Sequence, residues 1–94
     1  MRYELRYSNQ FKKQYKKLLR SGRNNILKDL EKTVELLAKG SVLSEKYRNH
    51  KLTGNLQDFF ECHITPDWLL IYKVYNDILV LELVSMGNHG ALFD

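Results

Sequence analysis

Hydrophobic and polar positions divide this chain into a helical first half and a strand-rich second half. Residues 2–7 alternate between charged and apolar side chains, which is the period-two pattern of a half-buried strand. Ser8 can then cap a helix, and Gly22 is a natural end for it. Within that helix the apolar residues form one stripe at helical spacing, namely Phe11, Tyr15, Leu18 and Leu19. A second amphipathic helix is predicted from residue 24 or 25 to Lys39, with Gly40 ending it.

The second half predicts three strands joined by turns. Residues 41–55 have no strong periodicity and are expected to form a loop. Strands are expected at residues 56–64, 68–75 and 78–84, with turns at 65–67 and 76–77. The order is therefore β-α-α-β-β-β. It predicts an α+β fold in which two N-terminal helices pack on a mostly antiparallel twisted sheet, with residues 1–94 forming a single domain.

Composition excludes several classes of protein. The chain has 44% hydrophobic and 28% charged residues, which fits a globular domain rather than a disordered one. No apolar run approaches the roughly 20 residues that a membrane span needs, so no membrane association is expected. The one cysteine, Cys62, excludes an intramolecular disulfide and fits a reducing cytoplasm.

Charge is distributed unevenly along the chain. Residues 1–51 carry fourteen Lys and Arg against five Asp and Glu, whereas residues 52–94 carry one against six. A positive field of this kind favours binding of a polyanion. The first helix supplies a basic surface that could contact RNA, formed by Lys12, Lys13, Lys16, Lys17 and Arg20. A lysine-rich helix face is also a common solvated surface, so charge alone does not decide between the two.

The candidate chemistry lies in the last 45 residues, where all three histidines occur. Histidine exchanges protons near neutral pH, so His50, His63 and His89, with Asp67, are candidates for acid–base catalysis on a negatively charged substrate such as RNA. Strand alternation places His63 opposite Cys62, and Asp67 could return beside His63 after the turn. The same alternation disfavours a shared metal site for Cys62 and His63, and a core-facing thiol is a poor nucleophile. Taken singly, each histidine would more often be structural.

Three segments resemble the YafQ-type toxins of the RelE superfamily. They are residues 47–54 (YRNHKLTG), 61–73 (ECHITPDWLLIYK) and 87–93 (GNHGALF). The resemblance implies a RelE-like fold and a ribosome-dependent mRNA endonuclease that needs no metal or other cofactor. It also implies three partners: an antitoxin protein, the ribosomal A site and the mRNA.

The resemblance also implies roles for individual residues. His50, His63, Asp67 and His89 match the acid–base set that promotes attack of the RNA 2′-hydroxyl on the adjacent phosphate. We expect His50 or Asp67 near the 2′-hydroxyl and His89 near the leaving oxygen. Aromatic and polar positions around them are expected to bind substrate, namely Trp68, Phe93, Arg48, Lys51 and Ser85.

Ser85 departs from the family pattern, because close relatives usually carry an arginine there. A serine offers a hydroxyl but no charge for the scissile phosphate, so Ser85→Arg is expected to raise cleavage unless Arg48 or Lys51 compensates. The departure leaves a second hypothesis open, a non-catalytic module that binds RNA or a partner protein. A third hypothesis is a gyrase-directed toxin of the same fold, which the clusters around His63 and His89 disfavour.

Overall fold

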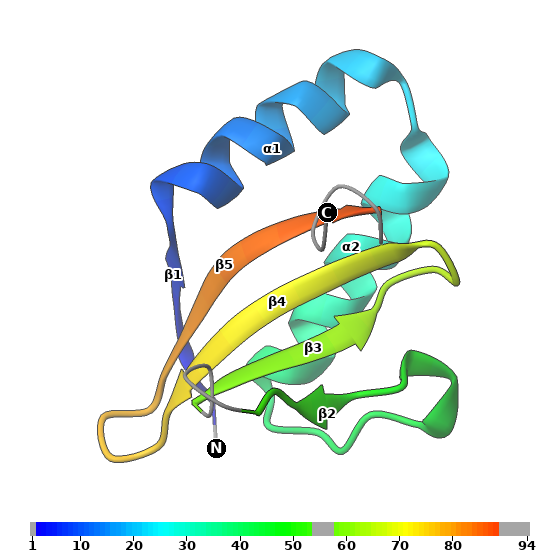
Figure 1. Ribbon diagram of the computed structural model, residues 1–94. Coiled ribbons are helices and arrows are strands. Elements are labelled where there is room, and N and C mark those ends of the chain that lie inside the picture. The colour runs from blue at the N-terminus through cyan, green and yellow to red at the C-terminus, as the bar shows by residue number, and fades with distance from the viewer. Residues whose placement is uncertain (1, 54–57, 89–94) are drawn as a thin grey trace.

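The computed structural model describes residues 2–53 and 58–88 and shows a five-stranded sheet with two helices (Figure 1). The N-terminal elements are β1 (Glu4–Tyr7), α1 (Asn9–Ser21) and α2 (Asn24–Ala38). A single 3₁₀ turn, η1 (Glu45–Tyr47), and a two-residue strand, β2 (His50–Lys51), follow. The remaining strands are β3 (Phe59–His63), β4 (Trp68–Tyr75) and β5 (Val80–Asn88).

The strands lie in the order β1-β5-β4-β3-β2, so the first strand of the chain pairs with the last. β1 runs parallel to β5, whereas the other three pairings are antiparallel, which confirms the mostly antiparallel sheet. In Figure 1 α2 lies behind the sheet, and α1 passes along β5. None of the helices in residues 2–53 and 58–88 has the length and apolar character to cross a membrane.

Both helices begin and end close to the residues that the sequence indicates. The Ser8 hydroxyl accepts a hydrogen bond from the Phe11 N–H at 3.0 Å, and so caps the N-terminus of α1. Gly22 ends α1 with φ 74°, a left-handed conformation that glycine adopts without strain. One position of the predicted stripe is wrong, because Leu19 is half exposed.

The core lies between the helices and the face of the sheet that they cover. Its buried members come from both helices, η1 and the three central strands; they include Phe11, Leu18, Leu30, Leu37, Tyr47, Cys62, Ile64, Leu70, Tyr72, Leu81, Leu83 and Met86. Cys62 and Leu70 are paired residues of β3 and β4, so their side chains share this face. The opposite face of the sheet carries His63 and Glu61, as strand alternation predicts.

The C-terminal half differs from expectation at two places. The last hairpin has a four-residue turn, Asn76–Leu79, so β5 begins two residues later and extends four residues further than predicted. Leu79 adopts a left-handed conformation (φ 52°), so it cannot be part of the extended strand that was predicted from its apolar character. The predicted loop contains η1 and β2, which are too short to produce a periodic pattern.

Side chains take over the hydrogen bonding of β5 where β1 ends. The ladder between the two strands stops at the pair Tyr7 and Leu83. Beyond it, the Ser8 hydroxyl donates to the Val84 carbonyl at 2.5 Å. Nearly two turns further along α1, the Gln14 side-chain oxygen accepts from the Met86 N–H at 2.7 Å. These two contacts attach α1 to the half of β5 that approaches the candidate site.

Candidate acid–base site

Strand pairing brings two of the candidate histidines to one face of the sheet. His50 of β2 is opposite Glu61 of β3, Glu61 is opposite Ile71 of β4, and Ile71 is opposite Ser85 of β5. Paired residues of antiparallel strands project from the same face. His63 lies two residues beyond Glu61 on that face, so it is the diagonal neighbour of His50, at a typical spacing of about 7–8 Å. Two of the predicted histidines are therefore brought together.

Both ring nitrogens of His50 contact acceptors within the fold. Nδ1 lies 2.9 Å from the carbonyl oxygen of Arg48, and Nε2 lies 3.5 Å from Oε1 of Glu61. A carbonyl oxygen can only accept a hydrogen bond, so Nδ1 carries a proton. Nε2 therefore faces the carboxyl group of Glu61, and the two form an ion pair when the ring is protonated. These two contacts fix the orientation of the His50 ring.

Glu61 was not among the candidate residues, although strand alternation placed it on the face of His63. Its side chain is only 8% exposed, and Oε2 has no hydrogen-bond partner among the described residues. A buried carboxylate oxygen without a donor is costly, and such groups concentrate at functional sites. His50, by contrast, keeps 53% of its side-chain surface exposed. Glu61 is therefore placed to orient a histidine that remains accessible.

His63 differs from His50, because only one of its ring nitrogens has a contact within the described part of the chain. Nδ1 lies 3.2 Å from the carbonyl oxygen of Pro66, which again requires the proton to be on Nδ1. The neutral ring therefore has its lone pair on Nε2. The turn does bring Asp67 back toward the strand, since the Trp68 carbonyl accepts from the Ile64 N–H at 2.8 Å. The imidazole contact is nevertheless with Pro66, whereas Asp67 is exposed.

Ser85 is placed against the helix rather than toward a substrate. The residue is 5% exposed, and its hydroxyl accepts a hydrogen bond from the Gln14 amide at 3.1 Å. The expectation that Ser85 binds the scissile phosphate is not supported by this placement, because the hydroxyl is used inside the fold. Gln14 itself gave no signal in the sequence, since a glutamine in a basic amphipathic helix is ordinary.

The remaining substrate-binding candidates are spread over both faces of the sheet. Lys51 is opposite Phe60, so it projects from the face opposite to His50. Arg48 is exposed in the left-handed position that ends η1 (φ 46°). The Trp68 ring packs against the core, and the guanidinium carbon of Arg23 lies 5.6 Å from its centroid. His89 and Phe93 lie outside the described residues.

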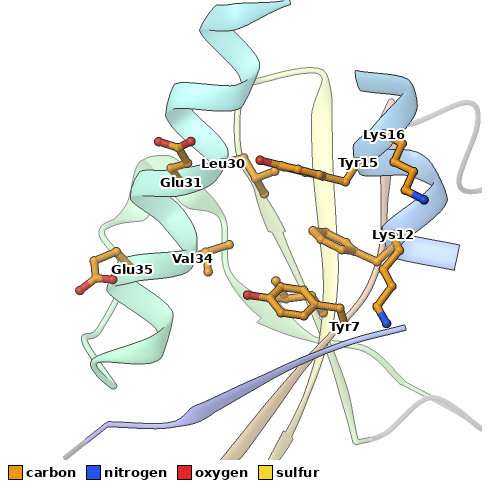
Figure 2. Close-up of a pocket in the computed structure, with 10 residues that line it drawn as sticks. Tyr7, Lys12, Tyr15, Lys16, Leu30, Glu31, Val34 and Glu35 are labelled. Atoms are coloured by element: carbon orange, nitrogen blue, oxygen red, sulfur yellow. The ribbon is translucent and has the colours of Figure 1, made fainter. Parts of the chain in front are cut away.

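All five cationic residues predicted on the first helix are exposed on α1. Two of them, Lys12 and Lys16, border an apolar groove of about 580 Å³ between α1 and α2. Figure 2 shows Tyr7 and Tyr15 reaching across this groove toward α2. The groove contains none of the candidate acid–base residues. This groove is therefore separate from the site formed by His50, Glu61 and His63.

Two titratable groups lie under the site without taking part in it. Burial raises the pKa of the Cys62 thiol to about 12, with a smaller contribution from the charge of Glu61. This thiol is protonated at neutral pH, which agrees with the expectation that it is not a nucleophile. Burial also raises the pKa of the Tyr72 phenol. The Tyr72 hydroxyl donates to the side-chain oxygen of Asn49 at 2.5 Å, which ties the residue before His50 to the core.

Comparison with known proteins gives a consistent result over nearly the whole chain. Residues 3–94 match the model of a family described as the bacterial toxin of type II toxin–antitoxin systems, YafQ. The mRNA interferase toxin YafQ of Escherichia coli K12 is 33% identical over 91 residues, which cover 96% of this chain and 95% of that protein.

Solved structures show the same fold. The YafQ chain of the E. coli DinJ–YafQ complex has a TM-score of 0.87 and 29% identity, with 98% of this chain and 99% of that chain covered. A metal-bound toxin from Helicobacter pylori has a TM-score of 0.86 and 41% identity, with 97% and 99% covered. These matches agree with the two helices and mixed sheet described above.

The metal in the H. pylori structure raises the question of whether this chain offers a comparable donor set. Within residues 2–53 and 58–88, no three His, Cys, Asp or Glu side chains are grouped so that they could hold a metal ion. His50 and Glu61 approach each other as a pair only. The described side chains therefore do not form a metal centre by themselves.

Proposed function

Because this chain belongs to the YafQ family of bacterial type II toxin–antitoxin toxins, we propose that it is a ribosome-dependent endoribonuclease that cleaves mRNA in the ribosomal A site. The observation that carries the proposal is the pairing of β2 with β3, which places His50, Glu61 and His63 side by side on one face of the sheet. The reaction is attack of an RNA 2′-hydroxyl on the adjacent phosphorus, which breaks the bond to the 5′-oxygen. It requires a base, an acid and stabilisation of negative charge.

We assign the base to His63, because the lone pair on its Nε2 is available when the ring is neutral. The sequence favoured His50 or Asp67 for this step, but both ring nitrogens of His50 are engaged. His50, held by the Arg48 carbonyl and by Glu61, instead lines the site beside His63. Asp67 is exposed in the turn that follows His63. His89 is assigned to protonation of the leaving 5′-oxygen by its match to the family motif.

We further propose that no metal takes part and that a cognate antitoxin is the partner that restrains the toxin. The first statement is supported by the candidate acid–base groups, which supply the proton transfers that the reaction needs. The second is supported by two solved structures of the E. coli DinJ–YafQ complex, both similar to this chain. The site of action would be the cytoplasm, where ribosomes translate.

Mapping of mRNA ends on purified ribosomes tests the proposal. The wild-type chain is expected to produce codon-phased cuts, detected by primer extension. His63→Ala and His89→Ala should each lower the rate by about 10²–10⁴-fold, because each removes one proton-transfer group. Asp77→Ala, an exposed residue of the distant hairpin turn, is the matched control and should cleave normally. Toxin dialysed against a chelator before the assay should keep its activity.

A non-catalytic binding module remains the second candidate, because Ser85 replaces the family arginine and is buried. The two functions differ in whether mRNA is cut. Growth arrest without mRNA cuts would favour the binding module, whereas cuts that persist at full rate in both histidine variants would overturn the assigned chemistry. Loss of activity after chelator treatment that returns when a metal is added would overturn metal independence.

A further inference from the structure

A second pocket, more polar than the groove between the helices, lies where the C-terminal half of α1 crosses the ends of β4 and β5. Its volume is about 330 Å³. Three elements contribute to its wall: α1 with its following turn, the start of β4 and the end of β5. The lining residues are Gln14, Lys17, Leu18, Ser21, Arg23, Trp68, Met86, Gly87 and Asn88. The two ionisable side chains among them, Lys17 and Arg23, are both cationic and both exposed.

Trp68 forms the inner wall of this pocket and carries an unsatisfied donor. Its indole Nε1 is buried and has no hydrogen-bond partner in the part of the chain that the structure describes. A buried N–H without an acceptor costs about 1–3 kcal/mol, so its retention calls for an explanation. The Arg23 guanidinium lies over the same ring, at 5.6 Å from the centroid. The Arg23 guanidinium thus lies over the same indole ring whose N–H has no acceptor among the described residues.

The rigid attachment of α1 fixes the position of the second cation. Gln14 is bound to both Ser85 and Met86, at 3.1 and 2.7 Å. Lys17 follows Gln14 by three residues, so it lies on the same side of the helix, facing the end of β5. The wall of the pocket thus consists of two strands and a helix that is hydrogen-bonded to one of them.

The pocket adjoins the chain positions from which two proposed catalytic residues depart. Trp68 and Asn88 are paired across β4 and β5. Asp67 directly precedes Trp68, and His89 directly follows Asn88. Ser85, which stands where relatives carry an arginine, is buried and uncharged. Positive charge near this end of the sheet therefore comes from Lys17 and Arg23.

We propose that this pocket is a binding site for an RNA backbone phosphate flanking the scissile one, with Lys17 and Arg23 contacting the phosphate oxygens. The Trp68 ring, with the Arg23 guanidinium over it, forms the inner wall of the site. The proposal rests on the proposed nuclease function for its choice of RNA as the ligand. It assigns to these two cations the charge that the family arginine would otherwise supply, although at a neighbouring phosphate.

The chain reports on this pocket by itself, because Trp68 is its single tryptophan. We would titrate the full chain with a short 2′-O-methyl RNA oligonucleotide, which cannot undergo 2′-hydroxyl attack, and record tryptophan emission. A saturable change in emission is expected. Lys17→Ala and Arg23→Ala should each weaken binding and lower the slope of log affinity against log salt by about 0.7, the value for one lost single-strand phosphate contact.

Lys28→Ala is the matched control, because it removes the same charge from an exposed position on α2 away from the pocket. An equal loss of affinity and slope in Lys28→Ala would overturn the proposal, since only net charge would then matter. An unchanged tryptophan spectrum at saturation, shown by anisotropy of a labelled oligonucleotide, would overturn it as well.

Cleavage on ribosomes separates this proposal from the proposed function. Normal cleavage by the wild-type chain, with Lys17→Ala and Arg23→Ala equally active and no emission change, would remove the phosphate site and leave the nuclease intact. A wild-type chain that cuts nothing but shows the emission change and the two variant effects would keep the site and remove the nuclease. Thermal unfolding of each variant checks that lost binding is not lost folding.

Discussion

Removal of the Gln14 side chain is expected to destabilise the protein far more than an ordinary substitution on a helix surface. The amide accepts the Met86 N–H at 2.7 Å and donates to the Ser85 hydroxyl at 3.1 Å, and both residues are at most 5% exposed. In Gln14→Ala, the Met86 N–H has neither a strand partner nor a side-chain acceptor, because β1 ends before this point.

The magnitude follows from the two lost contacts. An unsatisfied buried N–H costs about 1–3 kcal/mol, and the weaker loss at the rotatable hydroxyl adds about 0.5–1.5 kcal/mol. We therefore expect the free energy of unfolding to fall by about 2–4 kcal/mol. For a chain of this length, each kcal/mol lowers Tm by about 4–8 °C, so the midpoint should fall by at least about 8 °C.

The assay is urea unfolding followed by circular dichroism, with Gln10→Ala as the control. Gln10 is exposed on the same helix, so this control makes the same change in helix propensity but leaves the two hydrogen bonds of Gln14 intact. A double-mutant cycle with Ser85→Ala isolates the bond to the hydroxyl. If the free energies of unfolding of Gln14→Ala and Gln10→Ala agree within about 0.5 kcal/mol, the hydrogen bonds of Gln14 to Ser85 and Met86 do not stabilise the fold as argued, and the reasoning is refuted.

Three further predictions follow from the same contacts. Ser85→Arg is expected to lower Tm and not to raise cleavage on ribosomes, because the new side chain must leave a buried position; a faster enzyme would contradict this and restore the expectation from the sequence. Glu61→Gln should lower cleavage by about tenfold or more while leaving the urea midpoint equal or higher, because it removes a buried carboxylate charge but also the partner of His50. Equal activity would show that the pair has no role. The free energy of unfolding should decline as pH rises from about 9 to 12, since the folded state retains the protons of Cys62 and Tyr72 that the unfolded chain releases. In Cys62→Ala the decline of this free energy, measured by urea unfolding, should be shallower by up to about 1.4 kcal/mol per pH unit; an unchanged slope would contradict the raised pKa of the thiol.

The periodic parts of the fold could be predicted from the sequence. The N-cap at Ser8, the end at Gly22 and the whole of β4 appear as expected, because a long stretch of regular burial leaves a readable pattern. β2 could not be found in this way. Its two residues are held by pairing with β3, a tertiary interaction that leaves no local trace.

The site shows the same division. Alternation along β3 put His63 and Glu61 on one face, and it could have identified Glu61 as a candidate. The partner of His63 was beyond reach, because the turn geometry presents the carbonyl of Pro66 rather than the carboxylate of Asp67. Burial of Ser85 depends on Gln14, which is 71 residues away in the sequence.

The pairing of β1 with β5 has a consequence for the timing of folding. Residues 4–7 are made well before their strand partner, residues 80–83. Contacts between such distant segments form late, because the intervening chain must first be complete and closed into a loop. A growing chain therefore carries both helices without the strand to which Ser8 and Gln14 attach them. The sheet cannot be completed before residues 80–83 have left the ribosome, which leaves an interval in which a partner protein can meet the unfinished chain.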